Sequence, residues 1–232
     1  DMKKRILFVF IALSLVLANR SGLGAPWLER RLRGDDLSAW LRSGLGLTLL
    51  LLVAGSPFSW WLNRNANPAT YPFGWDLLPA SLKAGVVEEL VYRFALMSLF
   101  VWMGRFLKQD AEGCPHNFVY WGAILLSGLL FGWAHVDARL GHPTASFGDY
   151  ALIMLLNSAL GIYFGWVLWR LGLEWAMFAH FAYDAFTSIF IVPVTMLNSP
   201  LGWAVFLLVW VVMLVAGWRL LRQDQRNDQM DI

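Results

Sequence analysis

The sequence predicts an all-α fold, a polytopic membrane helix bundle with six core transmembrane helices. Of the 232 residues, 58% are hydrophobic and 15% are charged, whereas soluble domains carry about 25% charged residues. Six apolar runs each approach the ~20 residues that a helix needs to cross the hydrocarbon core. They cover residues 43–62, 84–104, 118–136, 149–170, 172–192 and 201–218, which together predict a single integral membrane domain over residues 1–232.

A shorter apolar run precedes these six. Ile6–Ala18 is 13 residues long and follows the sequence KKR. This length fits an interfacial or re-entrant helix, or a signal-peptide core, better than a spanning helix. We therefore expect an N-terminal interfacial, re-entrant or spanning helix before the six core helices.

The distribution of Lys and Arg predicts the orientation. If residues 6–18 do not cross and the C-terminus is cytoplasmic, 14 basic residues lie inside, and three lie outside, Arg64, Lys83 and Arg139. If residues 6–18 cross, the ratio becomes 11 against 6, and reversing the later helices puts the majority outside. We expect a multi-pass protein of the cell membrane, a prokaryotic plasma membrane, with a cytoplasmic C-terminus.

Composition excludes several classes of function. The single cysteine, Cys114, excludes a disulfide framework within the chain and a cysteine-based metal site. A net charge of +2 implies no nucleic-acid partner, and membrane lipids are the expected surroundings. Gly128-x-x-x-Gly132 and Gly161-x-x-x-Gly165 mark faces where helices approach closely, and we interpret them as packing within the chain, while the oligomeric state is left open.

The run at 84–104 contains three charged side chains, Glu88, Glu89 and Arg93. At the centre of a membrane helix, an acidic or basic side chain costs about 2.5–3.5 kcal/mol. Glu89 and Arg93 are four residues apart, so they share a helix face and can form an ion pair. Glu88 is rotated by about 100° from Glu89 and faces another direction. A purely structural ion pair beside one protonated Glu is the alternative.

Two later runs contain histidines. His135 ends the run at 118–136 and forms one stripe with Gly128 and Gly132, although alone it could simply lie at the membrane interface. His180 and Asp184 are four residues apart in the run at 172–192. Such a pair is costly unless it faces the protein interior, where an interhelical hydrogen bond is the alternative. Asn157 is a further buried polar candidate, with packing as its default role.

The predicted topology gives Glu88 and His135 the same depth, because one begins its helix and the other ends the next, antiparallel helix. Two His, a Glu and an Asp below the membrane surface are typical of a water-activating site. A carboxylate in apolar surroundings can take a proton from water near neutral pH. Imidazoles can orient that water or donate to a developing oxyanion.

Three motifs, Glu88-Glu89-x-x-x-Arg93, Phe131-x-x-x-His135 and His180-x-x-x-Asp184, occur in this order. This ordered set resembles the CPBP family of CAAX proteases and bacteriocin-processing enzymes, also called the ABI family. The resemblance implies an intramembrane protease with a catalytic core over residues 84–192.

In that family, Glu88 corresponds to the catalytic carboxylate, Arg93 supports the Glu88–Glu89 pair, and Phe131 belongs to the motif of His135. The resemblance implies that His135 helps Glu88 to activate water, and that His180 and Asp184 contribute to the oxyanion site. An ionised Asp184 cannot donate a hydrogen bond, so it is either protonated or only orients His180. The resemblance implies no cofactor, with a zinc ion held by Glu88, His135 and His180 as the alternative.

We therefore expect an intramembrane endopeptidase with a peptide or protein substrate. The predicted orientation puts Glu88 and His135 toward the non-cytoplasmic half of the membrane, which favours a membrane-associated or exported polypeptide over a cytoplasmic CAAX substrate. The alternative is a non-catalytic protein, a bacteriocin-immunity binding protein or a proton-coupled transporter with the same buried cluster. Six spans without an evident inverted repeat argue against a transporter.

Overall fold

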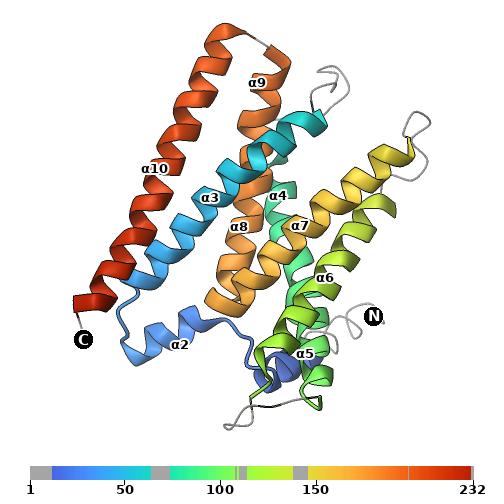
Figure 1. The fold of residues 1–232 in the computed structure, drawn as a ribbon, viewed down its shortest axis with the longest axis vertical. Helices are drawn as coiled ribbons and strands as arrows, with labels where there is room; N and C mark the ends of the chain where they lie inside the picture. The colour runs from blue at the N-terminus through green and yellow to red at the C-terminus, as the bar shows by residue number, and fades with distance from the viewer. Residues whose placement is uncertain are drawn as a thin grey trace. The chain divides into compact units, whose positions relative to one another are not determined.

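The computed structural model describes residues 12–63, 74–107, 109, 114–137, 146–197 and 199–230. These residues form helices, and the described part of the chain has no strand beyond one isolated bridge between Gln109 and Pro115 (Figure 1). A helix at residues 12–20 comes first. The others are α2 (Pro26–Arg33), α3 (Ser38–Asn63), η1 (Trp75–Leu77), α4 (Leu78–Glu88), η2 (Glu89–Met97), α5 (Ser98–Gly104), α6 (Asn117–Asp137), α7 (Phe147–Leu171), α8 (Leu173–Phe186), η3 (Thr187–Ile191), α9 (Val192–Leu197) and α10 (Pro200–Met230).

The helices confirm the predicted fold class, a polytopic helical membrane bundle. Among the described residues, five helical stretches are long and apolar enough to cross a membrane: Ser38–Trp61, Asn117–Val136, Phe147–Leu171, Leu173–Val194 and Pro200–Gln223. The sixth predicted run is helical as well, because α4, η2 and α5 follow one another without a break over residues 78–104. This segment differs from the five by its charged residues. Of the N-terminal run at 6–18, residues 6–11 lie outside the described residues.

Polar side chains and glycine set the helix ends. Before α3, Asp36 accepts hydrogen bonds from the backbone N–H of Ser38 at 2.8 Å and from its hydroxyl at 2.7 Å, and these two bonds lower the pKa of Asp36. Helix α7 begins with a capping box between Ser146 and Asp149. It ends at Gly172, whose φ of 100° and whose closeness to Pro26 leave no room for a side chain.

The chain forms two compact units, each built from two separate stretches of sequence. The first unit combines residues 1–27 with 86–176, and the second combines residues 28–85 with 177–232.

In the first unit, α6 and α7 lie side by side as an antiparallel pair (Figure 1). Glycines allow this approach, since a Cβ atom at Gly132 would lie 2.5 Å from the backbone oxygen of Met154. A Cβ atom at Gly161 would lie 2.9 Å from the Cα atom of Gly128. The two small-residue motifs thus pack against each other within the chain, as the sequence predicts.

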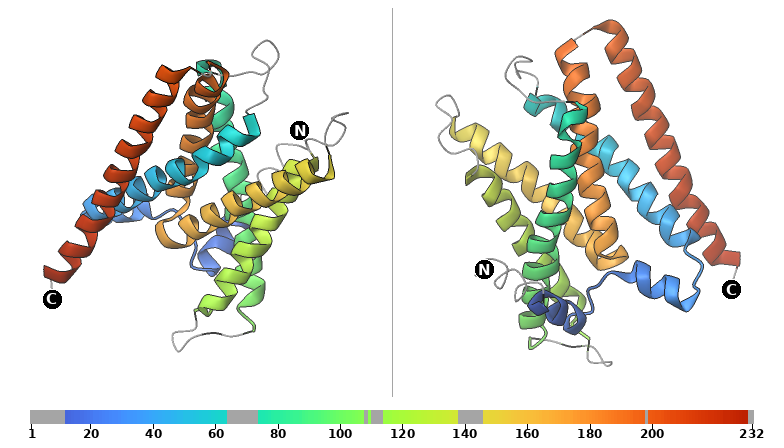
Figure 2. Two further views of the ribbon diagram at one scale, coloured as in Figure 1. Left: turned by 45° about the horizontal axis from the view of Figure 1, so that its top comes forward. Right: turned by 180° about the vertical axis from the view of Figure 1, so that it is seen from behind.

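In the second unit, α3 and α10 run antiparallel along each other in both views of Figure 2. Three contacts fix their register. At one end, a Cβ atom at Gly46 would lie 3.1 Å from the Gly217 carbonyl oxygen. In the middle, the Trp210 indole donates to the Val53 carbonyl at 3.0 Å. At the other end, the rings of Trp60 and Trp203 meet edge to face with centroids 5.9 Å apart. Positions 46, 53 and 60 advance by seven residues while 217, 210 and 203 recede by seven, the heptad spacing of closely packed helix pairs.

The Trp210 bond also resolves a local defect in α3. Pro57 lies inside this helix and has no N–H, so it cannot donate to the carbonyl four residues earlier, which is that of Val53. Membrane helices tolerate proline when a neighbouring helix satisfies the freed backbone group. Trp210 on α10 does this for α3.

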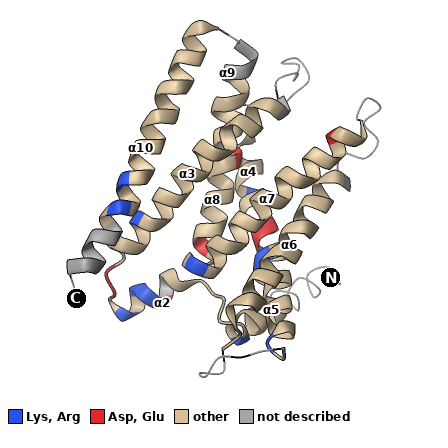
Figure 3. Cartoon of the chain, viewed as in Figure 1, with Lys and Arg blue, Asp and Glu red and all other residues tan. Residues whose placement is uncertain are grey.

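Basic side chains gather at one end of the second unit. Figure 3 shows Lys and Arg on α2 and at the adjoining ends of α3 and α10. The described residues concerned are Arg30, Arg31, Arg33, Arg42, Arg219 and Arg222.

Replacing Trp210 by Phe should destabilise the protein by about 1–3 kcal/mol, because the Val53 carbonyl then loses its donor in an apolar setting. In a Pro57→Ala background, residue 57 regains its N–H and can donate to Val53 itself, so Trp210→Phe should cost less. Unfolding free energies of the four proteins in detergent give this comparison, and the volume lost with the indole is the same in both backgrounds. Equal costs in both backgrounds would show that the hydrogen bond contributes nothing.

Candidate active site

Two consecutive carboxylates of the first unit have different surroundings. Glu88 is the last residue of α4, and Glu89 is the first residue of the π-helix η2. The Glu88 side chain is 33% exposed, whereas the Glu89 side chain has no exposed surface. The predicted division of the two acidic residues into one paired and one differently directed carboxylate therefore has a local structural basis. Short π-helical segments are frequent at functional sites.

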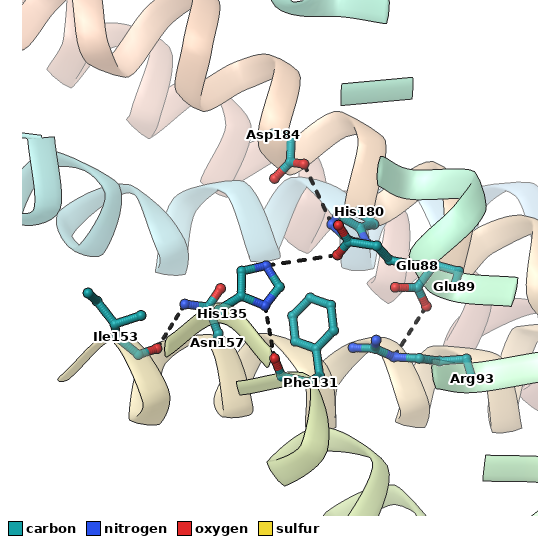
Figure 4. A network of polar contacts seen from close by, with 9 residues as sticks. All are labelled: Glu88, Glu89, Arg93, Phe131, His135, Ile153, Asn157, His180 and Asp184. Atoms are coloured by element: carbon teal, nitrogen blue, oxygen red, sulfur yellow. Dashed lines mark hydrogen bonds and ion pairs between the residues drawn. The ribbon is translucent and has the colours of Figure 1, made fainter. Parts of the chain in front are cut away.

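Arg93 pairs with Glu89. Its Nε atom lies 3.3 Å from the Glu89 carboxylate, and neither side chain has exposed surface. Removing a charge from water costs several kcal/mol, so each of these charges needs the other. Figure 4 shows the guanidinium beside the Phe131 ring, with 4.2 Å between the guanidinium carbon and the ring centroid. The Phe164 ring is 5.4 Å away and the Tyr92 ring 5.9 Å away.

These rings complete the surroundings of the cation. Among the described residues, Nη1 and Nη2 of Arg93 have no hydrogen-bond partner. Aromatic faces attract a guanidinium through their negative π-clouds, by about 2 kcal/mol or more when it is desolvated. Gly161 makes room for this arrangement, since a Cβ atom there would lie 3.1 Å from Nη2. The small-residue face of α7 therefore accommodates a buried cation in addition to a neighbouring helix.

His135 lies near Glu88 with a defined proton position. Its Nδ1 atom is 2.8 Å from the carbonyl oxygen of Phe131, four residues earlier on α6. A carbonyl can only accept, so Nδ1 carries the hydrogen and, in the neutral ring, Nε2 is an acceptor. Nε2 lies 3.9 Å from the Glu88 carboxylate, and the two side chains are 34% and 33% exposed. This separation is too long for a hydrogen bond and lets both groups contact one water molecule.

Phe131 connects the ion pair with the imidazole. Its ring centroid lies 4.4 Å from that of His135, and the same ring contacts the Arg93 guanidinium. Its carbonyl holds Nδ1 of His135. Phe131 is 1% exposed, so both contacts are shielded from solvent. A change at Phe131 therefore reaches the cation and the histidine together.

The third motif belongs to the second unit. His180 and Asp184 lie on α8 with Nε2 and the carboxylate 3.5 Å apart, and their side chains are 5% and 34% exposed. Figure 4 draws this contact as a dashed line. The Tyr183 hydroxyl bonds to Ser59 of α3 at 2.8 Å, and Ser59 bonds to Thr187 at 3.0 Å. These bonds tie α8 to α3 next to the His180–Asp184 pair.

Several residues of this environment escaped the sequence interpretation. Ser127 of α6 donates to the backbone oxygen of Tyr92 at 2.6 Å, and its only sequence signal is a lone hydroxyl in an apolar run. Phe164 carried no signal, because its contact with Arg93 joins separate helices. Asn157, by contrast, is a polar candidate that the sequence indicates, and it donates to the Ile153 carbonyl of its own helix at 2.8 Å.

The zinc alternative needs at least three protein ligands. Of its three predicted ligands, the first unit supplies Glu88 and His135, while His180 belongs to the second unit. Over the described residues, no group of three or more His, Cys, Asp and Glu side chains has an arrangement that could hold a metal ion. The zinc alternative therefore stays a prediction, and the proposed mechanism uses side chains alone.

These features define a class, a multi-pass helical membrane protein with a buried ion pair beside a partly exposed Glu–His pair. Residues 70–186, half of the chain, match the family model described as Type II CAAX prenyl endopeptidase Rce1-like. The chain therefore belongs to this protease family, and the match spans all three motifs. No curated protein and no solved structure matches the chain significantly.

The ion pair should show strong coupling between its partners. Arg93→Met leaves Glu89 buried without its cation and should destabilise the protein by about 3–5 kcal/mol. The double variant Glu89→Gln/Arg93→Met removes both charges and should lose less stability than Arg93→Met alone. Unfolding free energies measured in detergent test this order. A double variant that loses as much as the two single variants together would contradict the coupling.

Proposed function

We propose that this protein is an intramembrane endopeptidase that hydrolyses a peptide bond in a membrane-associated or exported polypeptide. Membership of the Rce1-like protease family supports the reaction class. The observation that carries the mechanism is the pairing of Glu88 with His135 at 3.9 Å. The bond from Nδ1 to the Phe131 carbonyl directs an acceptor nitrogen, Nε2, toward the carboxylate.

In this mechanism, one water molecule donates one hydrogen to the Glu88 carboxylate and the other to Nε2 of His135. Glu88 removes a proton as the water oxygen attacks the scissile carbonyl carbon. The tetrahedral intermediate then collapses, the C–N bond breaks, and Glu88 returns the proton to the leaving nitrogen. The water oxygen ends in the new carboxyl group, so the reaction consumes one water per bond and requires no redox partner.

The oxyanion role falls to His180, with Asp184 as its orienting partner. Asp184 lies next to Nε2 of His180, and an ionised carboxylate there accepts the Nε2 hydrogen. The oxyanion would then accept a hydrogen bond from the Nδ1–H of His180. In this role both ring nitrogens of His180 carry a hydrogen. This pair belongs to the second unit, whereas Glu88 and His135 belong to the first.

Glu89 and Arg93 keep the neighbourhood of Glu88 electrically balanced in this proposal. Together they carry no net charge, and the Glu88 carboxylate remains the base. Loss of Arg93 would leave the Glu89 carboxylate buried without its cation, one residue away from the base. Arg93 is therefore a positioning residue and not a group that touches the substrate.

Glu88→Gln and His135→Ala should each lower proteolysis by the purified protein at least about 100-fold, since the first removes the general base and the second removes the acceptor that orients the attacking water. Asp76→Asn, a change at an exposed carboxylate in η1, is the matched control and should retain activity. The substrate can be identified by comparing membrane and secreted proteomes with and without the gene. Wild-type processing by both site variants would leave the non-catalytic alternatives, an immunity or transport protein. Activity that disappears on exhaustive chelation and returns with zinc would contradict the metal-free mechanism.

We further propose that the C-terminus is cytoplasmic, on the basis of the basic residues at one end of the second unit. The single cysteine, Cys114, is exposed and lies in the connection before α6, which this orientation puts in the cytoplasm. A membrane-impermeant maleimide should therefore label Cys114 only after cells are permeabilised. In a Cys114→Ser background, a cysteine replacing Asp76 should be labelled in intact cells. The opposite pattern would reverse the orientation and bring a cytoplasmic substrate back into consideration.

A further inference from the structure

Ser127 makes an unusual hydrogen bond for a serine inside a helix. Such hydroxyls commonly donate to the carbonyl four residues earlier in their own helix, as Thr48 does to Gly44 in α3 at 2.8 Å. Ser127 instead donates from α6 to the Tyr92 carbonyl in η2 at 2.6 Å. Ser127 is 1% exposed, so water does not compete for this bond.

The acceptor lies in the middle of the π-helix at Glu89–Met97. A π-helix closes its backbone bonds between residues five apart and is rare, so it persists only where the surroundings support it. A buried donor from a neighbouring helix provides such support, because a side chain can stabilise a backbone carbonyl displaced from the α-helical ladder. The Val53 carbonyl in α3, which Trp210 supports from α10, is a second case in this chain.

The π-helix determines where the functional side chains of the first motif point. Glu88 directly precedes it and Arg93 lies within it. Relaxing this segment to an α-helix would shift the register by about one residue, a rotation of roughly 100° about the helix axis. Glu88 and Arg93 would then no longer be directed to His135 and to the Phe131 ring at once.

We propose that Ser127 is a positioning residue for catalysis, which holds η2 in its π-helical register and thereby directs Glu88 toward His135. This inference rests on the proposed function for its kinetic part. Ser127 touches neither the substrate nor the reacting atoms, and it acts through the backbone of Tyr92.

The direct test observes the Tyr92 carbonyl. The dipeptide Tyr-Arg occurs once in the sequence, at Tyr92-Arg93. Carbonyl-¹³C tyrosine combined with ¹⁵N arginine therefore isolates this one peptide bond in NMR spectra of the full-length protein. Ser127→Ala should shift the Tyr92 carbonyl resonance. Ser158→Ala is the matched control, since Ser158 is a 5% exposed serine of α7 without a hydrogen bond to η2, and it should leave the resonance in place.

The kinetic test uses the same variants. Ser127→Ala should lower kcat at least tenfold with little change in KM, because the base is misdirected while the substrate still binds. Ser127→Cys keeps the shape with a weaker donor, so its kcat and its carbonyl shift should lie between those of the wild type and Ser127→Ala. This variant keeps the proposal testable if Ser127→Ala does not fold.

Three results would overturn the proposal: an unmoved Tyr92 resonance in Ser127→Ala, a moved resonance with wild-type kcat, or an equal loss of kcat in Ser158→Ala. An active Glu88→Gln protein would refute the proposed function instead. In that case, the carbonyl resonance still reports whether Ser127 holds the π-helix.

Discussion

The opposite charges of Glu89 and Arg93, both without exposed surface, are the constraint to which the first unit conforms. Neither charge is tolerable alone at low dielectric, so the two must stay in contact and their remaining polar atoms need other partners. For Arg93, the aromatic faces of Phe131 and Phe164 serve this purpose. Gly161 is needed at this point of α7 because any larger side chain would press on the guanidinium.

Because of the same constraint, the two adjacent carboxylates differ in exposure and in their partners. Glu89 is held inside by Arg93, and Glu88 emerges on another side of the helix, where it is partly exposed and close to His135. Phe131 joins the two environments, since its ring faces the cation and its carbonyl fixes the hydrogen on His135. The buried Glu89–Arg93 ion pair thus stabilises a local geometry in which the neighbouring Glu88 carboxylate lies partly exposed beside His135.

The sequence predicted those structural features that residue type and local spacing determine. Apolar runs predicted the membrane helices, the i, i+4 spacing predicted the Glu89–Arg93 pair, and small residues predicted the close approach of α6 and α7. The π-helix was not predictable, because its register depends on a bond from Ser127, which is 35 residues away from Tyr92. The aromatic surroundings of Arg93 escaped prediction for the same reason, as they come from three different helices.

The order of synthesis matters for a unit assembled from two separate stretches of sequence. Helix α3 is synthesised before its partner α10, and 157 residues separate Val53 from the Trp210 indole that donates to its carbonyl. At ~5–20 residues per second, the nascent α3 waits roughly 8–30 s for that indole. During this interval, a proline-interrupted helix in an apolar environment needs a temporary donor, from water at the bilayer surface or from the insertion machinery. Helix α10 therefore completes the backbone hydrogen bonding of a helix that left the ribosome well before it.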